Sequence, residues 1–492
     1  MSLDLLTNLI HEGSTRPWQD VNSEWYAGLF GAPSGRYPKT AENQVQLRSP
    51  QMADDKGVSY AAIIHRDNPK SGRYRGTSLV IFPSSPTGPC LLGLVVGTDG
   101  LSPDEAILGR PGHARKAQAI ARWLNKRYGG GQRVAWAKQD PTRTDESVPS
   151  DLLKEWEDHK PALDRYGKEL YLLFRPTEDR SATRDAAAAM LDLLFEERGY
   201  EPLAAFSPHA SELKAAWFEH LMPSVDSAAV TELLQHRRFV ILQGPPGTGK
   251  TRLAVNLLRD RYQGHGISIQ FHPNTTYESF LGGLTPQHAA DALGLRFAPE
   301  PGALMRAAAA ALADPSRPYL LHIDEINRAD LGKVLGEGLF LLEAHADSPR
   351  VINLPYDFGP PFHRQLTLPP NLHLLGTMNS ADRSIALVDA AVRRRFAFVS
   401  LWPSTAIVDA NACPLMQTAF RRLTQLFIEY ASDDTLPLVP GHSYFLESDP
   451  AKAPTVLRTN LAPLLEEYLA QGYVSSFAEA IRSYLQWLNA TT

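Results

Sequence analysis

Short apolar runs, each followed by a polar segment, recur along the chain from about residue 225 onward. They have the length of buried strands and are too short for buried helices. A helix is predicted just before the first run, at 226–238, and the chain is largely helical from Pro403 onward. The predicted strands are 239–242, 267–271, 319–324, 372–377 and 396–401. This alternation of strands and helices predicts an α/β fold with a helical C-terminal part.

The first 200 residues show another mixture of strand and helix patterns. Apolar runs predict strands at 78–82, 90–96, 133–136 and 170–174, with helices near 115–127 and 187–198. Three prolines, Pro202, Pro208 and Pro223, interrupt the next stretch and predict a linker. We therefore expect four regions: a mixed α/β domain at 1–200, a linker at 201–224, an α/β subdomain at 225–402 and a helical subdomain at 403–492.

The strand at 239–242 leads directly into a glycine-rich loop, QGPPGTGKT. Glycines let the backbone turn tightly, so that free N–H groups and a helix N-terminus point at anionic phosphates. The spacing G-x-x-x-x-G-K-T between a strand and a helix is typical of a phosphate loop for a nucleoside triphosphate. We expect Lys250 to reach the β- and γ-phosphates and the Thr251 hydroxyl to hold Mg²⁺. The predicted nucleotide-binding residues are Gly244, Pro245, Pro246, Gly247, Thr248, Gly249, Lys250 and Thr251.

Polar side chains follow two further predicted strands. Asp324 and Glu325 end the run YLLHIDE, and Asn379 comes just after the strand at 372–377. Asp324 is expected to organise Mg²⁺, directly or through water, and Glu325 to polarise the attacking water. Asn379 could position that water and sense hydrolysis at the γ-phosphate.

Three arginines, Arg393, Arg394 and Arg395, stand together at the end of a predicted helix. Arginines are costly to bury, so we expect them to face solvent or a neighbouring subunit. In a ring they could neutralise charge on the neighbour's nucleotide. The alternative is a solvated basic helix end.

Four sequence motifs in this order resemble the McrB family of AAA+ NTPases. They are FHPNTTYESFLGGLTP, DEINRADLGKVLGEGLFLLE, GTMNSADRSIALVDAAVRRRF and GHSYF, and the resemblance covers roughly residues 225–445. The usual MNTAD of the family reads MNSAD here, and serine keeps the hydroxyl. The resemblance implies an AAA+ P-loop core with a C-terminal helical lid over the nucleotide, preceded by the mixed α/β N-terminal domain.

The same resemblance implies a function in restriction or anti-phage defence. Members of the family assemble as hexameric rings, prefer GTP, recruit a McrC-type partner that brings the nuclease, and read modified or otherwise marked DNA through N-terminal domains. Carried over by motif, Asn327 helps to arrange the catalytic water and Asn379 is the first sensor. Arg393 and Arg394 are then the arginines that act on a neighbouring subunit. The preference for GTP over ATP rests on resemblance alone, because the phosphate loop does not contact the base.

Charge and composition limit where DNA could bind. The formal net charge is −5, so a DNA-binding surface has to be a local patch. Aromatic residues of this region could stack on an extruded base, or they belong to the core. Two basic clusters in the N-terminal region are candidates, although solvated surface charge is the alternative for each. The first is Arg66, Lys70, Arg73 and Arg75; the second is Arg110, His113, Arg115 and Lys116; the aromatic candidates are Trp25, Tyr26, Tyr74 and Trp136.

Cysteine usage and hydropathy indicate a cytoplasmic protein. Cys90 and Cys413 stand far apart, which argues against a cysteine zinc site or a disulfide framework. The N-terminus lacks the basic start of a secretory signal. Prolines break the most apolar stretch, 79–97, so no membrane span is expected.

Two other functions remain open from the sequence. A MoxR-like AAA+ chaperone shares the motor motifs but would remodel proteins, and MNSAD with GHSYF favours the McrB side. A nucleotide-gated scaffold would need no turnover, and the intact Glu325, Asn379 and arginines argue against it. A nuclease within the chain is not expected, since Pro103-Asp104 and Glu212-Leu-Lys214 lie far apart. A hairpin insert at 354–370 is a further expectation, as a contact for a partner or DNA.

Overall fold

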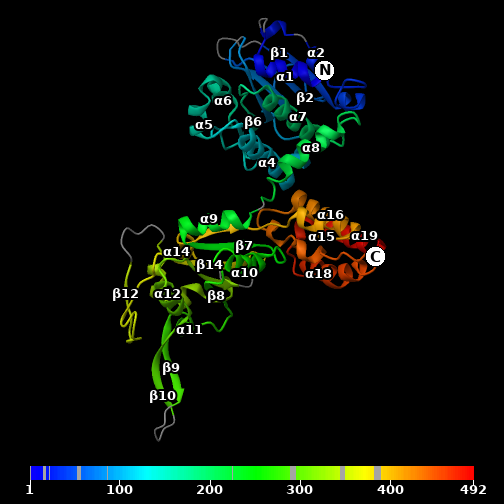
Figure 1. Ribbon diagram of the computed structural model, residues 1–492. Helices are drawn as coiled ribbons and strands as arrows, with labels where there is room; N and C mark the ends of the chain where they lie inside the picture. The colour runs from blue at the N-terminus through cyan, green and yellow to red at the C-terminus, as the bar shows by residue number, and fades with distance from the viewer. Residues whose placement is uncertain are drawn as a thin grey trace. The chain divides into compact units, whose positions relative to one another are not determined.

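The computed structural model describes residues 2–14, 18–21, 23–51, 57–85, 87–223, 225–288, 295–343, 350–381 and 389–491. The chain divides into two compact units (Figure 1). The first contains residues 1–222 together with 426–433, and the second contains residues 223–425 with 434–492.

The first unit is built on a six-stranded antiparallel sheet. Its strand order is β1-β2-β3-β4-β6-β5, and each neighbouring pair runs antiparallel. The strands are β1 (Val45–Gln51), β2 (Tyr60–His65), β3 (Thr77–Pro83), β4 (Cys90–Val96), β5 (Ala135–Ala137) and β6 (Leu170–Phe174). Every residue of β4 and β6 is buried, which explains their continuous apolar sequences.

Helices cover both faces of this sheet. Leu79 and Ile81 of β3 pack in one core with α1, α4, α7 and α8, whereas Val80 and Phe82 pack in a second core with α5 and α6. This alternation follows from the two-residue period of a strand. The helices are α1 (Ser2–Glu12), α2 (Glu24–Ala27), α3 (Glu105–Leu108), α4 (Pro111–Tyr128), α5 (Ser150–Glu155), α6 (Lys160–Tyr166), α7 (Arg180–Glu196) and α8 (Ser207–Phe218).

The stretch 201–224, predicted as a linker, instead contains α8. Leu213 and Trp217 of this helix are buried in the larger core of the first unit. The prolines misled the prediction because Pro208 stands in the first turn of α8, a position where a helix tolerates proline.

The second unit is built on a five-stranded parallel sheet. Its strand order is β15-β7-β14-β11-β8. Alternate residues again face two cores: Ile241 and Leu321 pack against α12 (Ala303–Ala313), while Val240 and Leu320 pack against α9 (Ser227–Arg237) and α10 (Lys250–Asp260). The strands are β7 (Phe239–Gly244), β8 (Gly266–Gln270), β11 (Tyr319–Asp324), β14 (Leu372–Asn379) and β15 (Ala397–Ser400). All five fall on the strands that the sequence predicts.

Two hairpins are inserted around this sheet. The predicted insert at 354–370 corresponds to a small pair, β12 (Ile352–Asn353) with β13 (Gln365–Leu366). A longer pair, β9 (Gly282–His288) with β10 (Leu295–Pro301), projects away from the sheet (Figure 1) and is absent from the sequence-based prediction. Pro286, Pro299 and Pro301 interrupt the apolar alternation of this hairpin and hide it.

The C-terminal part is helical, as the sequence predicts. It contains α15 (Thr405–Asn411), α16 (Pro414–Tyr430), α17 (Ala453–Val456), α18 (Ala462–Ala470) and α19 (Ala478–Thr491). Three short helices, α11 (Tyr277–Phe280), α13 (Leu331–Leu335) and α14 (Ala390–Arg393), lie between the strands in sequence. Among the described residues, no helix combines the length and the apolar character that a membrane span requires.

Candidate nucleotide-binding and hydrolysis site

The glycine-rich loop joins β7 to α10 in the predicted strand–loop–helix order. Gly247 and Gly249 have φ angles of 80° and 79°, a left-handed region that favours glycine. Gly249 is the N-cap of α10, so the free N–H groups of the first helical turn face the loop. The Thr248 hydroxyl donates to the carbonyl of Pro245 at 2.9 Å and braces the loop from within.

Lys250 lies beneath this loop with only 7% of its surface exposed. Its ammonium group donates to the carbonyls of Gly244 at 2.9 Å and Pro245 at 2.7 Å. Burial lowers the pKa of Lys250 to about 8, although the charges of Glu325 and Asp324 act to raise it. An ammonium group buried in this way would be stabilised by a bound anion such as a phosphate.

Asp324, at the end of β11, meets two hydroxyl groups. Its Oδ1 accepts hydrogen bonds from Thr251 Oγ1 at 2.8 Å and from Thr377 Oγ1 of β14. A hydroxyl and a carboxylate side by side are hard oxygen donors, the type that Mg²⁺ prefers. Thr251 and Asp324, the predicted metal ligands, therefore fit the ion.

Glu325 has a backbone conformation that is rare for its residue type. Its φ is 52°, and its N–H donates to Thr377 Oγ1 at 3.3 Å. Its side chain accepts from Asn379 Nδ2 at 2.8 Å, and Arg328 Nε lies 3.4 Å from its second oxygen. The predicted water-polarising carboxylate and the predicted sensor amide are thus in direct contact.

Asn327 is buried beside the same group. Its Nδ2 lies 3.5 Å from the carbonyl oxygen of Asn379, and its own Oδ1 is buried without a hydrogen-bond partner among the described residues. Such an unsatisfied acceptor can bind a water molecule. The three residues converge because the carboxyl ends of the parallel strands β11 and β14 meet at one edge of the sheet.

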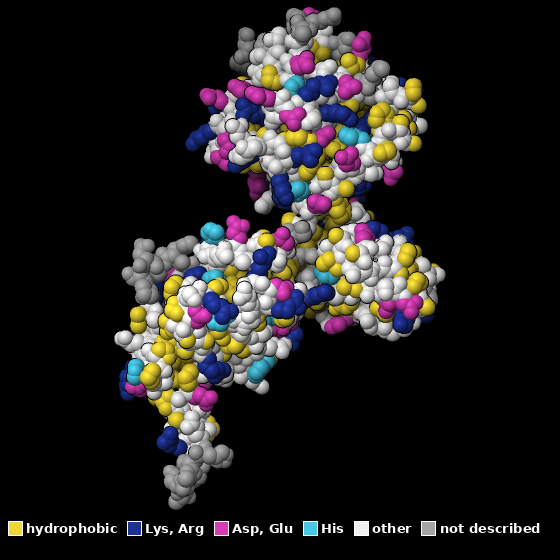
Figure 2. All heavy atoms as spheres, in the orientation of Figure 1, with side chains coloured by type: hydrophobic (Ala, Val, Ile, Leu, Met, Phe, Trp, Pro, Cys, Tyr) yellow, Lys and Arg dark blue, Asp and Glu magenta, His cyan; other side chains and the backbone are white. Residues whose placement is uncertain are grey.

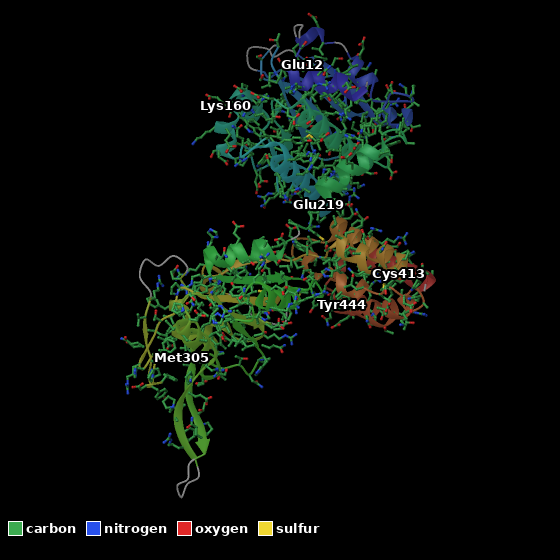
Figure 3. The ribbon with its side chains drawn as sticks, viewed as in Figure 1. Glu12, Lys160, Glu219, Met305, Cys413 and Tyr444 are labelled. Carbon is green, nitrogen blue, oxygen red and sulfur yellow. The ribbon has the colours of Figure 1, made fainter. Side chains whose placement is uncertain are left out.

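A turn from the C-terminal helical part rests on the glycine-rich loop. Gly441 N donates to the Pro246 carbonyl at 2.9 Å, and Ser443 N donates to the Gly247 carbonyl at 3.0 Å. A Cβ atom on Gly441 would lie 2.1 Å from the carbonyl carbon of Gly247, so only glycine allows this approach. The next turn, His442–Phe445, includes Tyr444, labelled in Figure 3. From the sequence, GHSYF is only a family motif, and this contact is not predicted.

The three arginines follow one another at the end of α14 and have different surroundings. Arg393 and Arg394 are exposed, and the guanidinium of Arg393 lies 5.3 Å from the ring centre of Phe398. Arg395 is buried, donates to the Ala391 carbonyl at 2.8 Å, and has its pKa lowered by burial. The expectation that all three face outward is therefore wrong for Arg395. Asp382 and Arg383 of the same motif lie outside the described residues.

The second basic cluster of the N-terminal region is paired with acidic residues, with His113 and Arg115 buried and Arg110 and Lys116 half-buried. Lys116 Nζ lies 2.7 Å from a Glu197 oxygen, and Arg110 pairs with the same carboxylate. His113 is 1% exposed, and burial lowers its pKa to about 3. Arg115 is likewise buried, at 2.8 Å from Asp433. These residues stabilise the first unit and do not form the open DNA-binding surface considered from the sequence.

The first basic cluster stays on the surface. Arg66, Lys70, Arg73 and Arg75 are all exposed on the loop between β2 and β3. On the face of the first unit that Figure 2 shows, basic and acidic side chains are otherwise interspersed. Of the aromatic candidates, Trp25 is core, and Tyr26, Tyr74 and Trp136 are half-buried.

Comparisons with known proteins agree with this site. Residues 239–396 match the family model described as AAA domain (dynein-related subfamily). The Type IV methyl-directed restriction enzyme EcoKMcrB subunit of Escherichia coli (strain K12) is 32% identical over 278 residues, covering 52% of this chain and 59% of that protein. The Type II restriction enzyme BsuMI component YdiS of Bacillus subtilis (strain 168) is 26% identical over 193 residues, covering 32% and 55%.

The chain thus spans less than two thirds of the length of the curated relatives that it matches. Among solved structures, NtrX from Brucella abortus covers 53% of this chain and 66% of its own, at 11% identity and a TM-score of 0.24, too low to carry an argument. The family match, the similarity to the EcoKMcrB subunit and the assembled phosphate loop agree with one another. Residues 239–396 form a P-loop NTPase domain of the AAA type (dynein-related subfamily), and over 52% of its length the chain is similar to the EcoKMcrB subunit.

Proposed function

We propose that this protein hydrolyses a nucleoside triphosphate, GTP in preference to ATP, to drive a ring-shaped motor in DNA restriction or anti-phage defence. The observation that carries hydrolysis is the contact of Glu325 with Asn379 beside the Thr251–Asp324 pair. A site that only bound nucleotide would need the loop and Lys250 but no oriented carboxylate.

Each residue of the site has a defined part in this proposal. The N–H groups of the glycine-rich loop and the ammonium of Lys250 bind the phosphates and stabilise the charge that develops in the transition state. Mg²⁺, when held by Thr251 and Asp324, supplies further neutralisation of that charge. Glu325 polarises the attacking water, while Asn327 and Asn379 orient it.

The assembly and the partners are also proposals. In a homo-hexamer, Arg393 and Arg394 would reach the nucleotide of the adjacent subunit, and both side chains are exposed at the end of α14. The name of the E. coli relative, a methyl-directed restriction enzyme subunit, supports a role with DNA. The first unit would bind marked DNA, and a McrC-like partner would bring the nuclease.

Steady-state hydrolysis of GTP and ATP, measured side by side, tests the proposal. Lys250→Ala serves as the blank, because it removes the buried ammonium from the phosphate site. We expect GTP to be turned over in preference and the blank to be inactive. Preference for ATP would contradict the GTP assignment and favour a MoxR-like chaperone instead. Absence of turnover for either nucleotide, with DNA and the partner present, would favour a scaffold.

A further inference from the structure

We propose that Thr377 is a positioning residue of the hydrolysis site. Its hydroxyl group joins the carboxylate of Asp324 to the backbone of Glu325, so that one side chain sets the geometry of both acidic residues. This inference rests on the proposed hydrolytic function, and it concerns a residue that the sequence motifs did not single out.

Thr377 is placed for this role by β14. The side chain is 2% exposed, and its Oγ1 donates to Asp324 Oδ1 while accepting from Glu325 N. A hydroxyl group has one donor hydrogen, and here that hydrogen is directed at the carboxylate. Threonine is also stiff about its first side-chain torsion, so the direction of the hydroxyl is well fixed.

Glu325 needs such a partner because of its backbone. A non-glycine residue at φ 52° persists only when its surroundings hold it there. Thr377 holds its N–H, and Asn379 holds its carboxylate. Thr377 and Asn379 are two residues apart on one strand and therefore project from the same face. The strand β14 thus holds both the backbone N–H and the side-chain carboxylate of Glu325.

Asp324 is oriented by the same hydroxyl. Its Oδ1 also accepts from Thr251, the expected metal-binding hydroxyl. Thr377 belongs to β14, the strand next to β11, so it holds the carboxylate independently of the glycine-rich loop. If Thr251 turned to a bound Mg²⁺, the hydrogen bond from Thr377 would still hold the carboxylate. A metal site whose ligands are held by neighbouring hydrogen bonds binds its ion more tightly.

Thr377→Val tests this inference, because valine keeps the shape and removes the hydroxyl. We expect the Mg²⁺ concentration for half-maximal binding of a fluorescent GTP analogue to rise about tenfold, since loss of such a supporting group typically costs 10–100-fold. We expect kcat to fall by a similar factor, with KM little changed. Binding of the analogue in EDTA should stay within about twofold of wild type, because the glycine-rich loop and Lys250 are untouched.

Thr377→Ser is the rescue variant and Thr231→Val is the matched control. Serine keeps the hydroxyl, so Thr377→Ser should show most of the wild-type Mg²⁺ response. This expectation does not depend on whether the valine variant folds. Thr231 donates within its own helix, to the Ser227 carbonyl, so its variant should match wild type. An unchanged Mg²⁺ response in Thr377→Val would overturn the inference, and so would an equal loss of binding in EDTA. The Mg²⁺ readout needs no turnover, so it separates failure of this inference from failure of the proposed hydrolysis.

Discussion

The two sheets of this protein differ in whether their strand directions bring the polar residues that follow the strands together at one edge. In the parallel sheet of the second unit, the strands β7, β11 and β14 end at one edge, and the polar residues that follow them meet there. In the antiparallel sheet of the first unit, neighbouring strands end at opposite edges, and no such convergence is imposed. A polar residue after a strand is therefore a strong functional signal in the first case and a weak one in the second.

The charged and polar residues that the sequence suggests as functional illustrate the difference. Asp324, Glu325 and Asn379 are predicted from strand ends, and the structure brings them together. Arg110 and Lys116 are candidates for a DNA-binding cluster in the sequence, but they pair with Glu197 inside the first unit. The partner of a buried charge in an antiparallel domain depends on tertiary packing, which the local sequence does not show.

The largest expected effect concerns the edge of the parallel sheet. Glu325→Gln keeps the shape and the contact to Asn379 but removes the charge that is proposed to polarise the attacking water. We expect kcat to fall about 10³-fold, within the usual range for loss of a general base, with nucleotide binding retained. Single-turnover hydrolysis and equilibrium binding check this prediction. The control is Glu337→Gln, because the Glu337 carboxylate accepts a hydrogen bond from Tyr277 away from the site. Turnover within tenfold of wild type would show that another group activates the water.

The second prediction concerns the contact between the turn at Gly441 and the glycine-rich loop, two segments that are far apart in sequence. Gly441→Ala places a Cβ atom against the backbone of Gly247, at 2.1 Å, so the turn must leave the glycine-rich loop. We expect nucleotide affinity to fall about tenfold or more, a loss on the order of 1.4 kcal/mol. Equilibrium binding of a fluorescent nucleotide checks this effect.

Gly332→Ala is the matched control for that substitution. Among the described residues, a Cβ atom there would meet only the Asp330 side chain at 3.5 Å, an ordinary contact, so binding should stay at the wild-type value. Wild-type affinity in Gly441→Ala would mean that the turn is not part of the binding site.

The third prediction uses the buried charge at the same edge. The free protein loses the Lys250 proton above pH 8, because burial lowers its pKa to about 8, whereas bound phosphate keeps the ammonium charged. Nucleotide affinity should therefore be nearly constant below pH 8 and fall as the pH rises, by about tenfold between pH 7.5 and pH 9. Calorimetry in two buffers of different ionisation enthalpy should also show proton uptake on binding at pH 9.

The control for this titration is Lys250→Arg, whose guanidinium stays charged throughout. Its residual affinity should follow only the titration of the nucleotide itself. A wild-type affinity that is flat up to pH 9, or that follows the arginine variant, would contradict the lowered pKa.

The sequence predicts the features that local sequence determines and misses those that depend on contacts between segments. All five strands of the parallel sheet and the residues at their ends are predicted, because most of the strands are apolar runs, β8 alternates apolar with polar residues, and the motif spacing is local. The hairpin β9–β10, the α8 helix in the expected linker, and the burial of Arg395 escape the prediction. Each of these depends on contacts between segments, and prolines obscure the first two.

The smallest expected effect concerns the exposed loop between β2 and β3 of the first unit. The β2–β3 loop is held in shape by buried polar side chains. Asn68 accepts from Arg75 N at 2.7 Å and donates to its carbonyl at 3.0 Å, and Arg48 donates to the Gly72 carbonyl at 2.7 Å. A loop held in this way presents its exposed cations in a defined arrangement, which suits contact with phosphates.

If the proposed DNA binding uses this loop, Lys70→Glu with Arg73→Glu should weaken binding of the full chain to duplex DNA. The slope of log affinity against log salt concentration should decrease in magnitude by about 2, one for each cation that no longer neutralises a phosphate. Lys154→Glu with Lys168→Glu makes the same change in net charge at other exposed positions of the first unit. An equal loss in both double variants would indicate a general charge effect and remove the loop from the DNA-binding surface. A loss confined to the loop variant would show that an antiparallel domain can carry its function on one loop, whereas the parallel sheet carries it at a shared edge.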